Sequence, residues 1–172
     1  EVPRNTTVYP TAGLAITEFT DEEYNKIEND LGTYSSAYAC SGDEDEYYSD
    51  EMTGLTSDKY YELKKKMLKS VYQNGGFYIG RYETGIADSY RTETNDTMQT
   101  PVIKQNAYPY NYVTTSQAQT LSERFGTAGY TSSLMFGMQW DLVMKYLETK
   151  GVPQAELTTD STSWGNYNNN LY

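Results

Sequence analysis

The side chains of this chain that could do chemistry are mostly carboxylates, because imidazoles and thiols are almost absent. The 172 residues include no histidine and a single cysteine, Cys40. A zinc, iron or copper centre needs several such ligands converging on one point, so the composition argues against one. Cys40 also lacks an imidazole base, and the acidic residues that follow it disfavour a reactive thiolate. We therefore predict no catalytic residue and no cofactor.

The acidic residues after Cys40 are the next candidates for chemistry. Asp43, Glu44, Asp45 and Glu46 are consecutive, and their oxygens are of the kind that calcium prefers. The run lacks the alternating spacing by which a calcium loop wraps one ion. We expect a solvated acidic loop here and predict no metal site.

A third group of residues, between 164 and 170, combines aromatic rings with side-chain amides. Tyr and Trp supply rigid amphipathic contact area and Asn supplies adaptable hydrogen bonds, a combination typical of surfaces that bind proteins or sugars. We predict a ligand-binding site here; the alternative interpretation is a polar turn around a buried tryptophan. The predicted ligand-binding residues are Trp164, Asn166, Tyr167, Asn168, Asn169 and Asn170.

Other charged residues have local explanations. Arg81 and Glu83 alternate with apolar residues in a predicted strand, where an arginine usually pairs with a nearby carboxylate. Glu123, Asp141 and Glu148 fall on polar helix faces, without the desolvation that tunes an acid–base pair. We expect a local ion pair for the arginine and a solvated surface position for the three helix acids.

Overall composition limits the classes of partner. The chain has 24 acidic and 13 basic residues, a net charge of −11, whereas nucleic-acid binding requires a basic surface. No segment approaches the roughly 18 apolar residues of a membrane helix, so we predict neither nucleic-acid binding nor membrane insertion. Nineteen tyrosines accompany four phenylalanines, and their hydroxyls favour half-buried or exposed positions. A composition rich in Tyr, Thr, Ser and Asn favours an extracellular, cell-surface or virion location.

Capping and periodicity place the first two helices that must support these residues. Thr20 and Glu23 have the spacing of a capping box and predict a helix over residues 20–31. A second helix is expected from Ser57 to the glycine pair at 75–76, with its lysines facing water or neighbouring acids. The expected inward face of this second helix consists of Tyr60, Leu63, Met67 and Val71.

The second half of the chain mixes a strand, an irregular segment and two helices. Alternation from Phe77 predicts a strand over residues 77–82 that begins a sheet, and residues 84–112 are expected to be irregular. A capping box at 114–117 starts a helix, and another helix is expected over 138–150. The expected inward residues are Ala118, Leu121 and Phe125 in the first, and Trp140, Val143, Met144 and Leu147 in the second.

Three motifs carry a resemblance to a known family: GGFYIGRYETG at 75–85, LMFGMQWD at 134–141 and SWGN at 163–166. In this order and at these separations they resemble the formylglycine-generating-enzyme-like (sulfatase-modifying-factor) branch of the C-type-lectin fold. The resemblance implies an α+β, C-type-lectin-like fold. Residues 75–172 would be the first part of that domain, and residues 1–74 an acidic N-terminal extension with two helices. The family's later strands are missing from this sequence, so either they lie on a separate piece or this chain ends its fold differently.

The resemblance also bears on function, through what the chain lacks. The family's enzymes use a pair of cysteines or a histidine cluster, and neither can be assembled from these residues. The chain is more similar to the variable receptor-binding proteins of diversity-generating retroelements. This similarity implies a non-catalytic domain whose Tyr/Asn/Ser-rich surface binds a protein or glycan at a bacterial or phage surface. Two alternatives remain: a self-assembling structural subunit of a surface or virion assembly, and a formylglycine-generating-type oxidoreductase whose thiols lie in a missing C-terminal half.

Overall fold

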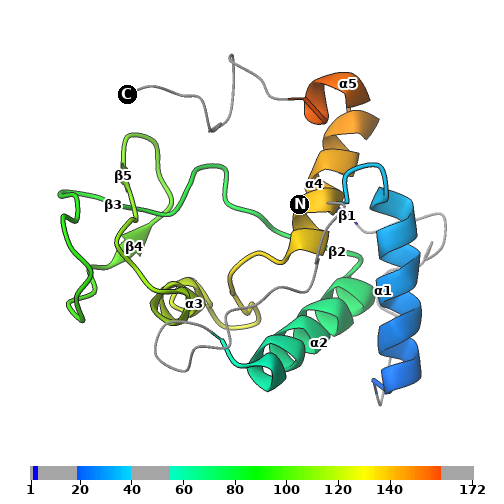
Figure 1. Ribbon diagram of the computed structural model, residues 1–172, viewed down its shortest axis with the longest axis horizontal. Coiled ribbons are helices and arrows are strands. Elements are labelled where there is room, and N and C mark those ends of the chain that lie inside the picture. The colour runs from blue at the N-terminus through cyan, green and yellow to red at the C-terminus, as the bar shows by residue number, and fades with distance from the viewer. Residues whose placement is uncertain (1, 4–18, 40–54, 160–172) are drawn as a thin grey trace.

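The computed structural model describes residues 2–3, 19–39 and 55–159, and these form an α+β arrangement of helices and very short strands (Figure 1). Along the long axis of the molecule the three-stranded sheet, α3, α2 and α1 follow one another. The elements, in chain order, are β1 (Val2–Pro3), α1 (Asp21–Ser35), α2 (Ser57–Asn74), β2 (Gly76–Phe77), β3 (Gly85–Ile86), β4 (Pro101–Val102), β5 (Tyr108–Pro109), α3 (Thr115–Glu123), α4 (Gly137–Thr149) and α5 (Gln154–Leu157).

The strands form two small antiparallel sheets. In the first, β1 pairs with β2, and Val2 lies opposite Phe77. In the second, β3 is the central strand between β4 and β5, so that Gly85 lies opposite both Val102 and Pro109. The long loop that joins β3 to β4 therefore begins and ends at neighbouring strands of one sheet.

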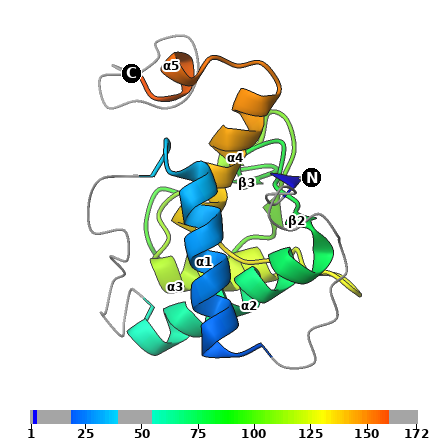
Figure 2. The ribbon, with the colours of Figure 1, turned by 90° about the vertical axis from the view of Figure 1, so that its right-hand side faces the viewer.

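The hydrophobic core lies among three helices. In Figure 2, α1 crosses in front of α2 and α4, and it packs against both. The core lies at one end of the molecule, away from the three-stranded sheet. Its buried members are Phe19, Ile27, Leu31, Leu68, Val71 and Leu142.

Two helices begin at the capping boxes that the sequence predicts. At the start of α1, the Glu23 amide donates to Thr20 Oγ1 at 3.2 Å and the Thr20 amide donates to Glu23 Oε2 at 2.9 Å. At the start of α3, Thr114 and Gln117 make the same reciprocal pair, with both bonds at 3.1 Å. Both predictions are confirmed, because each box depends only on residues three positions apart.

The buried face of α2 is displaced by one residue from the predicted face. We expected Leu63 and Met67 to point inward, and both are only half-buried. The buried residues are Lys64 and Leu68, each one position further along, and Val71, which was predicted to point inward. The predicted bounds hold, since α2 begins at Ser57 and stops at a left-handed Gly75 with φ +83°.

A lysine can occupy the buried face of α2 because a carboxylate of α1 meets it. Lys64 Nζ lies 2.6 Å from Glu28 Oε1, and the Lys64 side chain is 7% exposed. Its methylene stem is apolar, and the carboxylate offsets part of the cost of removing the ammonium from water. We expect the lysines of this helix to face water or neighbouring acids, and Lys64 contacts an acid but does not face water.

The prediction that Trp140 is buried is wrong, because its side chain is 50% exposed. The residues of α4 that are buried are Leu142 and Met144. Met144 lies on the same side of α4 as Trp140, four positions further on, and is buried as predicted, so this side is covered at Met144 and open at Trp140. The core residue Leu142 lies about 200° around the helix from Trp140. The half-buried Met138 and Val143 also contact the core, and they flank the same face.

The predicted strand over residues 77–82 is also wrong beyond its first residue. Only Gly76–Phe77 pairs, and Tyr78, Ile79 and Tyr82 are exposed. Alternation of side chains does not produce a strand without a partner strand to complete its hydrogen bonds.

None of the helices in the described ranges is long and apolar enough to cross a membrane.

Candidate functional site

The residues predicted to bind a ligand, from Trp164 to Asn170, lie outside the described residues. Cys40 and the acidic run at 43–46 lie outside them as well. Within the described ranges, no three Asp, Glu or Cys side chains converge as metal ligands would. The candidate site that the structure does describe was not predicted from the sequence, and it lies in the loop between β3 and β4.

This loop forms a polar pocket of about 260 Å³. Its volume is slightly below the roughly 300–1,000 Å³ that is typical of small-molecule sites. Hydrogen bonds within the loop hold its shape, and α3 contributes one more, from Gln117 Nε2 to Asn95 O at 3.3 Å. The pocket is lined by a buried arginine, Arg91, and by Tyr90, Thr92, Glu93, Asn95, Thr97 and Gln99.

Arg91 is the centre around which the loop is arranged. The residue is only 4% exposed, and its two amino groups donate to six oxygens. Four of these are main-chain carbonyls, which fix the path of the loop rather than the identity of its side chains. The acceptors are Thr97 O (2.6 Å) and Gln99 Oε1 (2.9 Å) for Nη1, and Glu93 O (3.4 Å), Asn95 O (3.2 Å), Asn95 Oδ1 (3.4 Å) and Tyr112 O (3.2 Å) for Nη2.

The charge of Arg91 is held by neutral oxygens. Among the described residues no carboxylate forms an ion pair with it. Its Nε is buried and has no partner there. A buried cation without a carboxylate is unusual, and it is tolerated only where several carbonyl dipoles replace water.

One of the carbonyls that Arg91 binds comes from a strained residue. Tyr112 has φ +53°, a left-handed conformation that is rare for a large side chain. The conformation turns Tyr112 O toward Arg91 Nη2, at 3.2 Å. Strain of this kind persists only where surrounding contacts hold it, and the arginine supplies one such contact.

The arginine also orients Gln99. A guanidinium has only donors, so the oxygen of the Gln99 amide must face Arg91, and its Nε2 has no protein partner among the described residues. Tyr110 fixes the backbone of the same residue, because its hydroxyl donates to Gln99 O at 3.1 Å. The pocket therefore contains an oriented amide donor that is available to a ligand.

Glu93 supplies an acceptor at the same pocket. Asn95 Nδ2 donates to Glu93 Oε1 at 3.3 Å, and Asn95 Oδ1 accepts from the Thr97 amide at 3.0 Å. The second carboxylate oxygen of Glu93 has no protein partner within the described part of the chain. An amide donor and a carboxylate acceptor thus line one small space.

No protein-family model, no curated protein and no solved structure matches this chain. Function must therefore be argued from its own residues.

Exposed tyrosines are concentrated in the part of the sequence that contains the pocket, and one of them, Tyr90, lines it. Among the described residues seven tyrosines are prominently exposed, and six of them lie between residues 78 and 130. Tyr90 and Tyr108 form a tilted pair with ring centres 5.9 Å apart, and Tyr78 and Tyr130 form an edge-on pair at 6.1 Å. The six are Tyr78, Tyr82, Tyr90, Tyr108, Tyr112 and Tyr130, and we call them the tyrosine surface.

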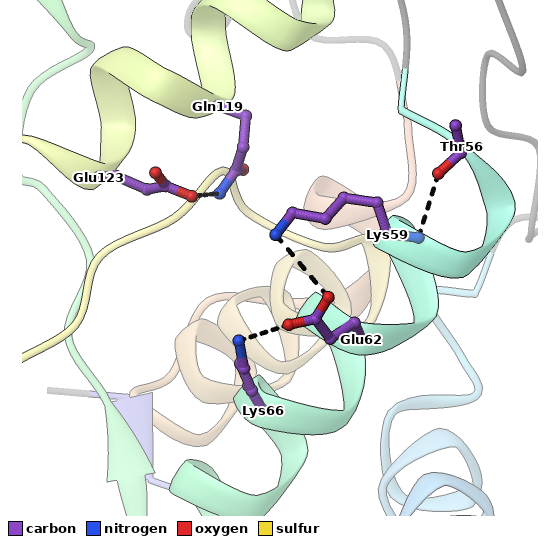
Figure 3. Close-up of polar contacts among 6 residues, drawn as sticks. All are labelled: Thr56, Lys59, Glu62, Lys66, Gln119 and Glu123. Atoms are coloured by element: carbon purple, nitrogen blue, oxygen red, sulfur yellow. Dashed lines mark hydrogen bonds and ion pairs between the residues drawn. The ribbon is translucent and has the colours of Figure 1, made fainter. Parts of the chain in front are cut away.

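A second polar region, between α2 and α3, is internally paired (Figure 3). Glu62 accepts from Lys66 at 2.7 Å and lies 3.8 Å from Lys59, all on α2. On α3, Gln119 Nε2 donates to Glu123 at 2.9 Å. Since these charged groups meet partners of their own helix, the region offers less to a ligand than the pocket at Arg91.

Glu148, expected at a solvated surface position, is 31% exposed and has two partners that the sequence does not predict. The Tyr38 hydroxyl donates to Glu148 Oε2 at 2.7 Å, and Lys145 Nζ lies 3.0 Å from the same oxygen. The Tyr38 bond and then the lysine lower the pKa of Glu148. Burial and then the hydrogen bond to Glu148 raise the pKa of Tyr38 to about 12. This pair joins the segment after α1 to α4, within the helical part of the molecule, so it is a structural contact.

The role of Arg91 could not be predicted from the sequence, because no motif near it distinguishes it from other arginines. It stands in a polar segment that is expected to be irregular, and four of its acceptors are main-chain oxygens. Arg81 and Glu83, which were singled out, are both exposed. The one usable signal is the density of Thr, Asn and Gln from 92 to 99, which is typical of a hydrogen-bonded loop.

Proposed function

We propose that this chain is a non-catalytic binding domain that recognises a protein or glycan through its tyrosine-rich surface. The observation that carries the proposal is the tyrosine surface itself, six exposed rings gathered within residues 78–130. Exposed aromatic residues concentrated in one region are a feature of binding surfaces, because each ring gives large contact area at a small cost in conformational entropy.

The polar pocket at Arg91 supports the same proposal. Binding sites of small or oligomeric ligands combine aromatic walls with a few convergent polar groups. Tyr90 lies at the pocket and also in the tyrosine surface, so the two features are continuous. We infer that they serve one recognition function.

The finer assignments of fold and place rest on the sequence motifs. We propose a C-type-lectin-like domain of the formylglycine-generating-enzyme-like branch, displayed at a bacterial or phage surface. The support is the order and spacing of GGFYIGRYETG, LMFGMQWD and SWGN. The absence of histidine and the single cysteine support a domain without that family's catalytic centre.

The test is binding of the labelled chain to a glycan microarray and to intact bacterial cells. Replacing the four rings of the two tyrosine pairs by serine (Tyr78, Tyr90, Tyr108 and Tyr130) should abolish binding. The melting temperature should hardly change, because these rings are exposed. A double Tyr61→Ser, Trp140→Ser variant removes exposed rings from the helices and should bind normally. Binding that survives the quadruple change, or a wild-type chain that binds neither glycans nor cells, would overturn the proposal.

The predicted residues from Trp164 to Asn170 form a second arm of this test. Tyr167→Ala with Asn169→Ala should reduce binding without lowering stability if that segment contributes to the same surface. Lower stability with normal binding would indicate a packed turn instead.

A further inference from the structure

We propose that the pocket formed by residues 90–99 binds one uncharged sugar unit of a glycan. This inference rests on the proposed binding function and adds to it a site and a ligand class. It depends on three properties of the pocket, which are the neutral use of its arginine, the arrangement of its free polar groups, and its aromatic wall.

The pocket disfavours anions, although an arginine lines it. Both amino groups of Arg91 are engaged by protein oxygens, as close as 2.6 Å at Thr97 O. An acidic ligand would find both amino groups of Arg91 engaged and its remaining donor, Nε, buried, and it would meet the carboxylate of Glu93. The net charge of the chain, −11, adds a further repulsion. A neutral polar ligand avoids both penalties.

The free polar groups of the pocket suit neighbouring hydroxyls. Gln99 Nε2 is a donor, the second oxygen of Glu93 is an acceptor, and the hydroxyls of Thr92 and Thr97 can act as either. A sugar hydroxyl both donates and accepts, so two adjacent hydroxyls can bind the carboxylate and the amide together. Ligands without hydroxyls would leave these groups unpaired on binding, which reduces affinity.

Tyr90 supplies the apolar wall that a sugar ring requires. Its side chain is 67% exposed, and its ring leans on Tyr108 with centres 5.9 Å apart. The C–H face of a pyranose is apolar and can cover an aromatic ring while its hydroxyls reach polar groups. The volume of about 260 Å³ is small and favours one ring rather than a large ligand.

Arg91 prepares the pocket before the ligand arrives. It holds the carbonyls of three loop residues and the Gln99 amide in fixed positions. A site that is already ordered loses less entropy on binding. Arg91 is therefore a positioning residue, and its own donors remain within the protein.

The experiment is NMR titration of the isotope-labelled chain with methyl glycosides of glucose, galactose, mannose, fucose and N-acetylglucosamine. Glucuronic acid and N-acetylneuraminic acid form the acidic arm. At least one neutral glycoside should shift the amide signals of residues 90–99, with a Kd in the millimolar range, about that expected of a single small ring. Shifts from the acidic sugars alone would overturn the neutral assignment.

Two variants address the pocket without disturbing its frame. Gln99→Glu keeps an acceptor for Arg91 and removes the free amide donor, and Gln105→Glu makes the same charge change at an exposed position outside the pocket. Tyr90→Ala removes the wall, and Tyr61→Ala removes an exposed ring of α2 that lies outside the tyrosine surface. The first member of each set should weaken sugar binding about tenfold or more, and the second should leave it unchanged.

The outcomes separate this inference from the function on which it rests. If the chain binds cells or glycans and the quadruple tyrosine variant does not, yet Tyr90→Ala and Gln99→Glu bind as wild type, the pocket is wrong and the binding function stands. If a protein ligand shifts amide signals elsewhere on the tyrosine surface, the pocket is likewise wrong and the binding function stands. No shift at residues 90–99 with any neutral glycoside also overturns the pocket. If the chain binds nothing in either experiment, both the pocket and the binding function are wrong.

Discussion

The ammonium of Lys64 and the carboxylate of Glu28 lie 2.6 Å apart, and they join α2 to α1 beside the hydrophobic core. The lysine side chain is 7% exposed and the glutamate side chain is 30% exposed. Water can therefore solvate the glutamate alone far better than the lysine alone. Replacing the lysine should therefore lower the free energy of unfolding less than replacing the glutamate.

Glu28→Gln should lower the free energy of unfolding by about 1–3 kcal/mol, because it removes a carboxylate that contacts a buried ammonium. Lys64→Met should be nearly neutral, since methionine fills the same space and the remaining glutamate is partly solvated. The measurement is urea unfolding of both variants. The exposed pair on α2 is the control, and Glu62→Gln should leave the unfolding free energy nearly unchanged, because water screens this pair. Equal losses for Glu28→Gln and Lys64→Met would contradict the asymmetry.

Trp140→Ala should cost less than about 1 kcal/mol, because the side chain is half exposed and lies away from the core. Leu142→Ala should cost about 2–5 kcal/mol, since it leaves a cavity in the core. Thermal melting of the two variants compares opposite faces of one helix. A loss at Trp140 as large as that at Leu142 would show that the tryptophan is covered.

Arg91→Lys should destabilise the loop by about 2–4 kcal/mol, although the charge is kept. An ammonium has three donors and cannot reach the six oxygens that the guanidinium fork holds. Hydrogen exchange of the amides at 92–99 should become faster than in the wild type. Arg81→Lys, at an exposed position, should leave exchange unchanged. Unaltered protection in Arg91→Lys would mean that the arginine is not what orders the loop.

Stability should depend on pH through Tyr38 and Glu148. The pKa of Tyr38 is raised from 10.0 to about 12, so the native state retains a proton that the unfolded state loses. This contribution is complete below about pH 10 and is lost as pH rises from 10 to 12. The lowered pKa of Glu148 gives a contribution that is present above its ordinary value of 4.5 and is lost as pH falls below it. Tyr38→Phe should flatten both limbs of a plot of unfolding free energy against pH, and parallel curves would refute the assignment.

Two glycine substitutions should have opposite signs. A Cβ on Gly85 would lie 2.5 Å from Tyr108 O and 2.8 Å from Ala107 Cβ, so Gly85→Ala should force β5 away and cost about 1–3 kcal/mol. A Cβ on Gly32, inside α1, would meet nothing within 4 Å, and Gly32→Ala should stabilise by about 0.5–1 kcal/mol. Melting temperatures that shift in the same direction would contradict this contrast.

The features that the sequence predicts are those determined within a few residues. The boxes at Thr20 and Thr114 and the stop at Gly75 depend on local hydrogen bonds and backbone conformation, and all three are observed. The buried side of a helix depends instead on what packs against it. That is why Trp140 is exposed and Lys64 is buried, against expectation.

The candidate site could not be predicted for a related reason. Arg91 meets Gln99 eight positions away and Tyr112 twenty-one positions away, and no periodic pattern specifies such meetings. These contacts can be recognised only when the path of the loop in space is known. Similarly, the alternation from Phe77 predicts a strand, but a strand forms only where a second strand lies beside it, and the local pattern does not show whether one does.

Because Arg91 holds the loop mainly through main-chain carbonyls, the loop backbone should keep its conformation when exposed side chains of the loop are changed. Any amino acid other than proline can present the same carbonyl without altering the neighbouring backbone, and the side chains of Thr92, Thr94 and Asp96 are exposed and bind none of the arginine's donors. A library randomised at these three positions should therefore yield mostly folded proteins, whereas one randomised at Arg91 should not. The fold separates the residues that can be diversified from the one that cannot, and so allows new specificities to be selected on a constant frame.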